Sequence, residues 1–255
     1  MRHTLVFLLA LTALTSPAGA GDAPAARIPI LVELFTSEGC SDCPPADAFL
    51  QQLDRQPVPG AEMVVLSEHV DYWNHDGWKD PYSSSFFSGR QAEYAREFSL
   101  RSVYTPEMVV DGSSEFVGSN QAVASKAFAK ALTVTKVDIR LTSLSIGSDD
   151  ILRAHVETAS LPKSPKADLY AAIALNHAES QVSAGENAGR TISHTAVARS
   201  VTRIAALREN QPFTKDIQLK LPPNTNPQNS RLVMFIQESH QGKVLGATMQ
   251  PFSPQ

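Results

Sequence analysis

The chain has 255 residues, of which 42% are hydrophobic and 19% are charged, so its length allows one large domain or two ordinary ones. This composition excludes a disordered chain and a fibrous protein. The formal net charge of −4 argues against a basic nucleic-acid-binding protein. The chain has 2 cysteines, Cys40 and Cys43, which excludes a disulfide-rich scaffold.

Residues 1–20 have the pattern of a secretory signal peptide. A positive start at Arg2 precedes an apolar run over 5–14 and an Ala18-Gly19-Ala20 ending. The run is shorter than the ~20 apolar residues of a membrane-spanning helix. We therefore expect cleavage near Ala20, a periplasmic or secreted protein, and no stable membrane span.

In chain order, the first half alternates predicted strands and helices. Apolar runs and periodicities predict a strand, a helix, a strand, a helix, two hairpin strands and a last helix, at 28–35, 46–53, 63–66, 85–98, 107–110, 116–118 and 123–132. The two cysteines lie between the first strand and the first helix. A Cys-x-x-Cys beside such a βαβ pattern is a redox signal.

The second half, from Val134 onward, has period-two runs and polar turns instead of helical periodicity. It predicts seven strands, near 137–146, 151–158, 169–176, 191–204, 213–221, 232–237 and 243–249. Seven short strands with polar turns are typical of an immunoglobulin-like β-sandwich. We therefore expect an α/β domain over 28–133 and an all-β sandwich domain over 134–255.

Export and spacing together indicate what the cysteines do. Thiols outside the cytosol tend to be oxidised. A structural disulfide stabilises more when it closes a longer loop, whereas Cys40 and Cys43 are separated by only two residues. We therefore interpret the pair as a reactive dithiol that forms a redox disulfide, with no other cofactor.

The position of the pair before a helix assigns a role to each sulfur. Backbone N–H groups and the helix dipole stabilise a thiolate at a helix N-terminus. Cys40 is the expected attacking thiol, and Cys43 is close enough to resolve a mixed disulfide. Gly39 would let a substrate chain approach closely. Asp42 is unfavourable, because a nearby carboxylate raises a thiol pKa.

Five stretches of the sequence carry a resemblance to a known family, and they lie at 32–47, 69–73, 77–81, 104–112 and 185–191. Over 30–132 the chain resembles the thioredoxin superfamily. Over nearly the whole mature chain it is similar to a group of exported bacterial thioredoxin-like proteins known only as a domain of unknown function. The resemblance implies a thioredoxin-like fold for the first domain and no established substrate.

The superfamily places a cis-proline opposite the dithiol, and Thr105-Pro106 matches that motif. An X-Pro bond is the only kind that readily becomes cis. The resemblance implies that Thr105 and Pro106 present backbone to a substrate strand. The alternative is an ordinary trans proline at the start of a strand.

Two positions depart from the thioredoxin pattern. Gly39 stands where thioredoxins have a tryptophan, and Leu34 stands where they have a buried acid that serves the resolving thiol. Glu33 is adjacent to Leu34 but should face the other way, because strand side chains alternate. The remaining candidates for proton transfer, or for a ligand role, are Glu38, Asp42 and His69.

Three functional hypotheses follow. The first is an exported thiol–disulfide oxidoreductase that acts on protein or small-molecule thiols. The second is a zinc or copper carrier, with four ligands from Cys40, Cys43, His69 and His75. The third is a non-catalytic thioredoxin-like interaction module. The sequence leaves the physiological partner and the oligomeric state open.

Two further groups of residues have a structural and a functional interpretation. Aromatic side chains follow the second strand at Tyr72, Trp73, Trp78 and Tyr82. They either recognise a partner or pack over the end of the sheet, and packing is favoured. Polar side chains gather in the second half at Glu186, Asn187, Arg190 and His194. We expect these to be solvated loop or turn residues, with ligand binding as the alternative.

Overall fold

The computed structural model describes residues 27–56, 58–162 and 166–252, so the predicted signal peptide lies outside the described residues. The helices are α1 (Pro44–Arg55), α2 (Ser85–Glu97) and α3 (Gln121–Ala131), with a short 3₁₀ helix η1 (Pro227–Asn229). The strands are β1 (Ile28–Thr36), β2 (Ala61–His69), β3 (Glu107–Val110), β4 (Ser114–Val117), β5 (Ile139–Ile146), β6 (Ile151–Thr158), β7 (Ala167–Gln181), β8 (Thr191–Leu207), β9 (Phe213–Lys220), β10 (Ser230–Glu238) and β11 (Val244–Pro251).

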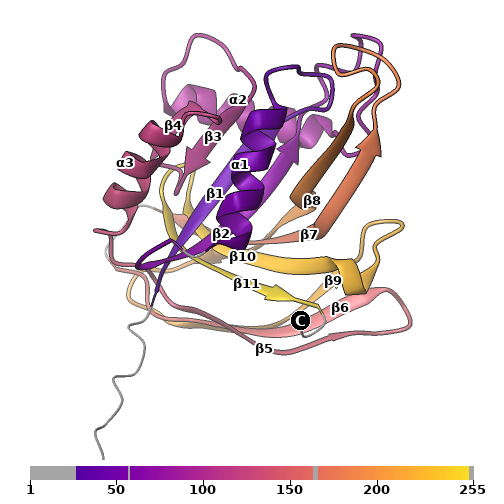
Figure 1. Cartoon of the computed structure of the whole chain (residues 1–255). Helices are drawn as coiled ribbons and strands as arrows, with labels where there is room; N and C mark the ends of the chain where they lie inside the picture. Colours follow the sequence, from indigo (N-terminus) through magenta and orange to yellow (C-terminus); the bar gives the residue numbers. More distant parts are fainter. Residues whose placement is uncertain (1–26, 57, 163–165, 253–255) are drawn as a thin grey trace, which may run out of the picture.

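The strands form an 8-stranded sheet in the order β11-β10-β7-β8-β2-β1-β3-β4 and a 3-stranded sheet in the order β5-β6-β9. Strand β1 runs parallel to β2 and antiparallel to β3. Figure 1 shows α1 in front of β1 and β2, and the small sheet below β10 and β11. Among the described residues, no helix is both long enough and apolar enough to cross a bilayer.

The large sheet crosses the boundary that the sequence predicts near residue 134. Strand β8 pairs in parallel with β2 through Ser67 and Val197, so four strands of the second half extend the sheet of the first half. The expectation of two separately built domains is therefore corrected to two halves that share one sheet. Hydrophobic periodicity identifies a strand but not the edge to which it pairs, since any edge strand has unpaired N–H and C=O groups.

Four hydrophobic clusters are buried among the described residues, and three of them fill the space between the layers. One face of β1, β2 and β3 packs on α1 and α3. The opposite face of β1 and β2, including Leu31 and Leu66, packs against strands of the second half around Phe235. A third cluster lies between the small sheet and β7 and β10. Each half therefore contributes to the core of the other.

The start of helix α1 is set by the two prolines that follow Cys43. Pro44 and Pro45 occupy its first turn, where a missing N–H costs nothing. The Cys43 carbonyl accepts from Ala46 N at 2.9 Å and from Asp47 N at 3.1 Å. The apolar stripe is buried through Ala46, Phe49, Leu50 and Leu53. The buried stripe fixes the helix on the sheet and so places the cysteines at its amino end.

Candidate functional site

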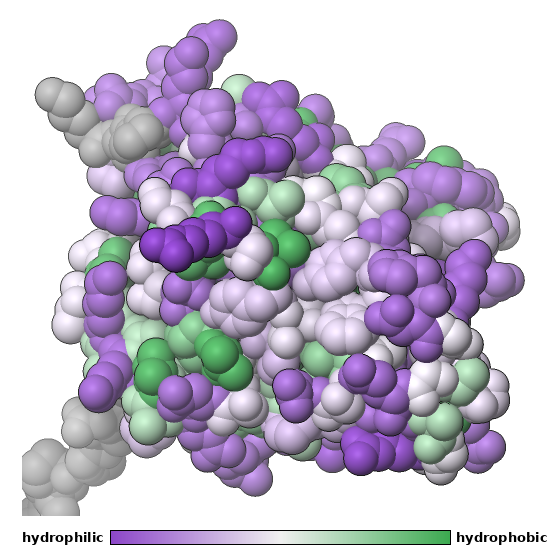
Figure 2. Space-filling view, turned by 90° about the horizontal axis from the view of Figure 1, so that it is seen from above, coloured by the Kyte–Doolittle hydropathy of each residue, from purple (hydrophilic) through white to green (hydrophobic). Residues whose placement is uncertain are grey.

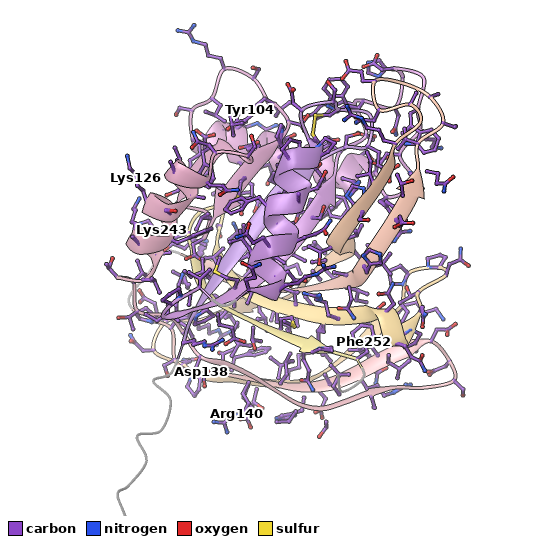
Figure 3. The ribbon with its side chains drawn as sticks, in the orientation of Figure 1. Tyr104, Lys126, Asp138, Arg140, Lys243 and Phe252 are labelled. Atoms are coloured by element: carbon purple, nitrogen blue, oxygen red, sulfur yellow. A yellow bond between two sulfur atoms is a disulfide. The ribbon has the colours of Figure 1, made fainter. Side chains whose placement is uncertain are left out.

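Cys40 and Cys43 form a disulfide at the amino end of α1, with their Cα atoms 5.4 Å apart. Figure 3 shows it as the yellow bond at the upper end of that helix. Cys40 is only 2% exposed and Cys43 is 0% exposed. Both sulfurs are therefore covered in this state.

Part of the cover is the loop between β7 and β8, which belongs to the second half of the chain. The buried Asn187 side chain donates from Nδ2 to the carbonyls of Glu38 and Cys40, each at 2.9 Å. Glu186 Oε2 accepts from the backbone N–H of Ser41 at 2.9 Å. These three hydrogen bonds hold the loop on the segment that contains Cys40.

Two tryptophans complete the cover. Trp73 Nε1 donates to Thr105 Oγ1 at 2.8 Å, and Trp78 Nε1 donates to Glu38 Oε2 at 2.8 Å. A Cβ on Gly39 would lie 3.1 Å from the Trp73 Cβ, so Gly39 makes room for this tryptophan. Figure 2 looks onto this end of the molecule and shows a pale, neutral centre among hydrophilic side chains.

The Thr105-Pro106 bond is cis, which confirms the prediction for that bond. Pro106 is buried, and its carbonyl accepts from Gly118 N at 2.9 Å. A Cβ on Gly118 would lie 3.0 Å from the Ala46 Cβ and 3.4 Å from the Pro106 Cβ. Pro106 therefore lies beside the first turn of α1, next to the disulfide segment.

Five buried titratable side chains form a network that reaches the segments on either side of the dithiol, and we call them the histidine–carboxylate cluster: Glu38, Asp47, His69, Asp80 and His194. His69 Nδ1 is 2.7 Å from Asp80 Oδ2, which also accepts from Glu38 N at 3.0 Å. Burial alone would raise the pKa of Asp80, but His69 and the backbone N–H groups lower it to about 2. Asp80 is therefore ionised at neutral pH.

His194 reaches this cluster from β8. Its Nε2 is 3.3 Å from Glu38 Oε1, its Nδ1 is 3.5 Å from Asp47 Oδ1, and its ring centroid is 4.5 Å from that of His69. Burial lowers the pKa of His194, but Asp47 and Glu38 outweigh it and raise the pKa to about 10. His194 is therefore an imidazolium between two carboxylates at neutral pH.

The sequence-predicted site residues divide into two groups. Glu38 and His69 lie in the cluster, whereas Asp42 is exposed. The His75 side chain is 76% exposed while His69 is buried, so the four proposed metal ligands are not brought together. Within the described ranges, no group of three or more His, Cys, Asp or Glu side chains is arranged to hold a metal ion.

Sequence reasoning missed Asp47, Asp80, Asn187 and His194 as parts of this site. A signal for Asp47 exists, because it lies four residues after Cys43 on a helix and so on the same face. No local signal places Asn187 and His194 here, because they depend on the pairing of β8 with β2. The expectation that both are solvated loop residues is wrong, since both are buried.

A second buried polar cluster lies on the other face of β1 and β2, and we call it the Arg90 cluster: Glu33, Glu68, Arg90, Tyr94 and Gln237. Arg90 Nε donates to Glu33 Oε1 at 2.7 Å, and Tyr94 OH donates to Glu33 Oε2 at 2.5 Å. Burial and the neighbouring Glu33 raise the pKa of Glu68. Glu33 thus faces away from α1, as strand alternation predicts.

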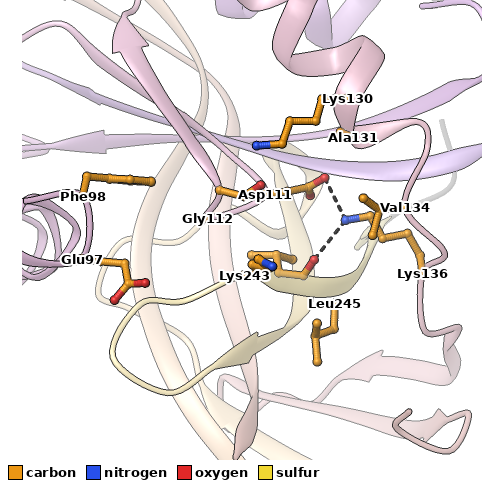
Figure 4. Close-up of a pocket in the computed structure, with 12 residues that line it drawn as sticks. Glu97, Phe98, Asp111, Gly112, Lys130, Ala131, Val134, Lys136, Lys243 and Leu245 are labelled. Carbon is orange, nitrogen blue, oxygen red and sulfur yellow. Dashed lines mark hydrogen bonds and ion pairs between the residues drawn. The ribbon is translucent and has the colours of Figure 1, made fainter. Parts of the chain in front are cut away.

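A cavity of about 330 Å³ lies far from the dithiol, at the other end of β1 (Figure 4). Its apolar lining includes Phe98, Ala131, Val134 and Leu245. Lys136 and Asp111 form a buried ion pair of 2.8 Å at its wall, and Lys130 and Lys243 project toward it. The cavity contains no residue of the dithiol site, so it plays no part in the chemistry considered below.

Comparison with known proteins gives a family without an assigned activity. Residues 31–237 match the family described as "Protein of unknown function (DUF1223)". No curated protein matches the chain.

Two solved structures are similar to this chain over most of its length. A crystal structure of a protein from Agrobacterium tumefaciens has 22% sequence identity and a TM-score of 0.71, and the match covers 90% of this chain and 97% of that chain. HBP35 of Porphyromonas gingivalis has 13% identity and a TM-score of 0.64, with 88% of this chain and 75% of that chain covered. At these identities the likeness concerns the fold alone.

Proposed function

This chain belongs to the DUF1223 family of proteins of unknown function, and we propose that it is an exported thiol–disulfide oxidoreductase. The observation that carries the proposal is the Cys40–Cys43 disulfide at the amino end of α1. The cis Thr105-Pro106 bond, beside the first turn of that helix, adds to it. The substrates are thiols or disulfides of an external partner.

The fold that we propose for the first half is thioredoxin-like. Supporting it are the element order from β1 to α3 and the strand order β2-β1-β3-β4, with the dithiol directly after β1. For the second half we propose an immunoglobulin-like sandwich whose larger sheet is fused to the first. Its seven strands, β5 to β11, support that assignment.

The exchange reaction conserves atoms and electrons between the protein and a dithiol partner. A partner thiolate attacks Cys40 Sγ, the bond to Cys43 breaks, and the electron pair stays on Cys43 Sγ, which takes up a proton. The partner's second thiolate then attacks the mixed disulfide and releases Cys40. The products are a partner disulfide and the Cys40–Cys43 dithiol, and the reverse sequence oxidises the protein.

The burial of both sulfurs requires an opening step before exchange. A loop held by three hydrogen bonds, two of them from Asn187, is a small barrier compared with global unfolding. Opening the β7–β8 loop would uncover the Cys40 side of the disulfide, whereas Cys43 lies deeper. This order of access supports Cys40 as the sulfur that a partner attacks.

Cysteine variants test the proposal directly. In Cys43→Ser, we expect Cys40 to form mixed disulfides that accumulate and are released by reductant, because no resolving thiol remains. Cys40→Ser should trap none, because the buried Cys43 is inaccessible. The wild-type protein should exchange with dithiothreitol and with a model protein disulfide.

The opposite results favour a non-catalytic module. In such a module, dithiothreitol would not reduce the wild-type disulfide as long as the protein stays folded. The Cys43→Ser variant would accumulate no mixed disulfide. Thiol counting and mass spectrometry of the trapped species give both readouts. The two cysteine variants are matched controls for each other, because each removes one sulfur from the same covered bond.

A further inference from the structure

Helix α1, which presents the dithiol, rests against β8 from the second half of the chain. The contacts along the helix pair neighbouring β8 residues with α1 side chains: Asp47 with His194, Gln51 with Ser193, and Asp54 with Thr195. Two of the three are hydrogen bonds of 2.5 and 2.6 Å, whereas His194 and Asp47 are 3.5 Å apart. The contact nearest to the disulfide is therefore the loosest.

Asp47 connects this contact to Cys43. Its backbone N–H donates to the Cys43 carbonyl at 3.1 Å, so the two residues are one helical turn apart. Side chains on a helix lean toward its N-terminus, so Asp47 leans over the turn that contains Cys43. The Asp47 carboxylate also accepts from Thr36 Oγ1 at 3.3 Å, which holds it at the end of β1.

The polar atoms of His194 and its neighbours are buried without hydrogen bonds. Among the described residues, these atoms are Glu38 Oε1, Asp47 Oδ1, His69 Nε2, and both ring nitrogens of His194. Buried polar atoms without partners are rare and call for a functional or structural reason. Five of the ten such atoms among the described residues belong to this one cluster, where His194 meets Glu38 and Asp47 only as ion pairs of 3.3 and 3.5 Å. Because the cluster includes the first turn of the helix that carries the dithiol, a reaction that changes the charge or the protons of this site offers a reason for it.

The charges that face His194 come from every element around it. Glu38 lies after β1 and Asp47 on α1, while His69 ends β2 and Asp80 follows it. The Tyr82 ring lies 6.1 Å away between centroids. The imidazolium is thus set against carboxylates beside a sulfur that becomes a thiolate when the disulfide opens.

We propose that His194, acting through Asp47, controls the protonation of Cys43 during exchange. The proposal rests on the oxidoreductase function and gives the second half of the chain a part in it. His194 is a positioning residue, because its ring contacts Asp47, which is one helical turn from Cys43. Thioredoxins have a buried acid at the position of Leu34, and in this chain His194 and Asp47 would take over its role in proton transfer.

The proton inventory of the step balances. When a partner thiolate attacks Cys40, the breaking bond leaves its electron pair on Cys43 Sγ. A proton passes from the His194 imidazolium through the Asp47 carboxylate to that sulfur, and His194 regains a proton from solvent once the loop opens. In the reverse direction His194 first releases its proton to solvent, and the pair then receives the Cys43 proton as that thiol attacks the mixed disulfide.

The test compares three variants that keep the shape of α1 and its contacts: His194→Asn, Asp47→Asn and Asp54→Asn. Asp54→Asn is the charge-matched control, because Asp54 also forms a buried ion pair, with Arg231 at 2.6 Å, but lies two turns farther along α1. Stopped-flow reduction by dithiothreitol is measured over a pH series for each oxidised protein. Dividing each variant's rate by the wild-type rate cancels the ionisation of dithiothreitol.

In His194→Asn the rate at neutral pH should fall by roughly tenfold or more, a magnitude typical of lost proton transfer. The reduced His194→Asn protein should show a higher Cys43 pKa by thiolate absorbance, because two carboxylates then face the sulfur without a cation. In Asp47→Asn the pH at which the rate ratio changes should move down, because His194 loses one carboxylate. Asp54→Asn should match the wild type within about twofold at every pH, as expected for a site that does not share partners.

The outcomes separate this proposal from the one on which it depends. A wild-type protein that does not exchange, together with a Cys43→Ser variant that traps nothing, overturns both. If the wild type exchanges normally and the ratio of the His194→Asn rate to the wild-type rate stays near one at every pH, only the role of His194 is overturned. Equal losses in Asp47→Asn and Asp54→Asn also overturn it, since they indicate a general weakening of the α1–β8 contact. If His194→Asn does not fold, the Asp47→Asn profile decides.

Discussion

The two buried polar clusters lie on opposite faces of the same two strands, and their bonding differs. In the Arg90 cluster the guanidinium donates to Glu33, Tyr94 and Gln237, and also to Gln241. In the histidine–carboxylate cluster the His194 nitrogens are 3.3 and 3.5 Å from their carboxylates, longer than typical hydrogen bonds. The Arg90 guanidinium is therefore rich in hydrogen bonds, although both carboxylate oxygens of Glu68 in the same cluster lack them, whereas neither ring nitrogen of His194 makes one.

The difference indicates what each cluster does. A buried guanidinium whose hydrogen bonds are made helps to fix a unique packing, here between β1, α2 and β10. A buried cluster with unmade hydrogen bonds costs stability, and such a cost is expected at functional sites. The Arg90 cluster lies on the face of β1 and β2 away from α1, whereas the other includes Asp47 in the first turn of α1, the helix that carries the dithiol. We therefore assign the first to structure and the second to chemistry.

The largest expected effect that separates the clusters is a pH dependence of stability. The pKa of His194 in the folded protein, about 10, lies above the ordinary histidine value of 6.5. Its contribution to stability is therefore fully present below pH 6.5 and is lost as the pH rises toward 10. At its steepest, this loss is about 1.4 kcal/mol per pH unit.

Guanidinium unfolding at a series of pH values measures this contribution as the difference between wild type and His194→Asn. The wild-type free energy of unfolding should fall more steeply between neutral pH and pH 10. Asp54→Asn should keep the wild-type slope, because it leaves the pair of carboxylates around His194 intact. Parallel curves for wild type and His194→Asn would contradict the charged state of His194.

The next largest effect is the loss of the Arg90 guanidinium. Arg90→Met leaves Glu33 buried without a cation, which costs about 3–5 kcal/mol of folding free energy. Chemical denaturation measures the loss. Exchange with dithiothreitol in the folded fraction should stay within about twofold of wild type, since distant sites act independently.

The double variant Glu33→Gln/Arg90→Met is the control for this prediction. Removing both charges should recover part of the stability, because no charge is then left buried alone. A loss of exchange in Arg90→Met at conditions where the protein is folded would contradict the assignment of this cluster to structure. It would also place part of the exchange chemistry on the α2 face of the sheet.

Local sequence patterns predict the elements and the immediate surroundings of the dithiol. Each predicted strand and helix of the first half has a counterpart between β1 and α3. The Cys43-Pro44-Pro45 run places the cysteines at a helix start, and Thr105-Pro106 is cis. These features depend on periodicity, on proline geometry and on residues close in the chain.

Long-range pairing lies beyond those patterns. Asn187 and His194 reach the dithiol because β8 joins the edge of β2, and nothing in residues 185–194 specifies that edge. The burial of Cys40 follows from the same pairing, since it brings the β7–β8 loop over the sulfur. A polar residue in a predicted loop and one in an active site look alike until the sheet order is known.

A smaller effect on stability and on the reduction rate is expected from weakening the β7–β8 loop that covers the Cys40 segment. Asn187→Ala removes two buried hydrogen bonds to the Glu38 and Cys40 carbonyls, which costs about 1–3 kcal/mol when the acceptors stay unpaired. The same change should speed the reaction of dithiothreitol with the disulfide, because the β7–β8 loop opens more often. Thermal unfolding and stopped-flow reduction measure the two effects on one sample. A slower reaction in Asn187→Ala would mean that the loop assists exchange rather than covering the sulfur.

The smallest expected effect comes from the adjacent residue. Glu186 is exposed and accepts one hydrogen bond from Ser41, which lowers the Glu186 pKa. In Glu186→Gln the side-chain amide oxygen still accepts that bond, so the unfolding temperature at neutral pH and the reduction rate should stay near the wild-type values. Because the folded Glu186 pKa is depressed, its contribution is present at neutral pH and is lost in acid. If Glu186→Gln weakens the cover as much as Asn187→Ala does, the exposed charge rather than the buried amide holds the loop over Cys40.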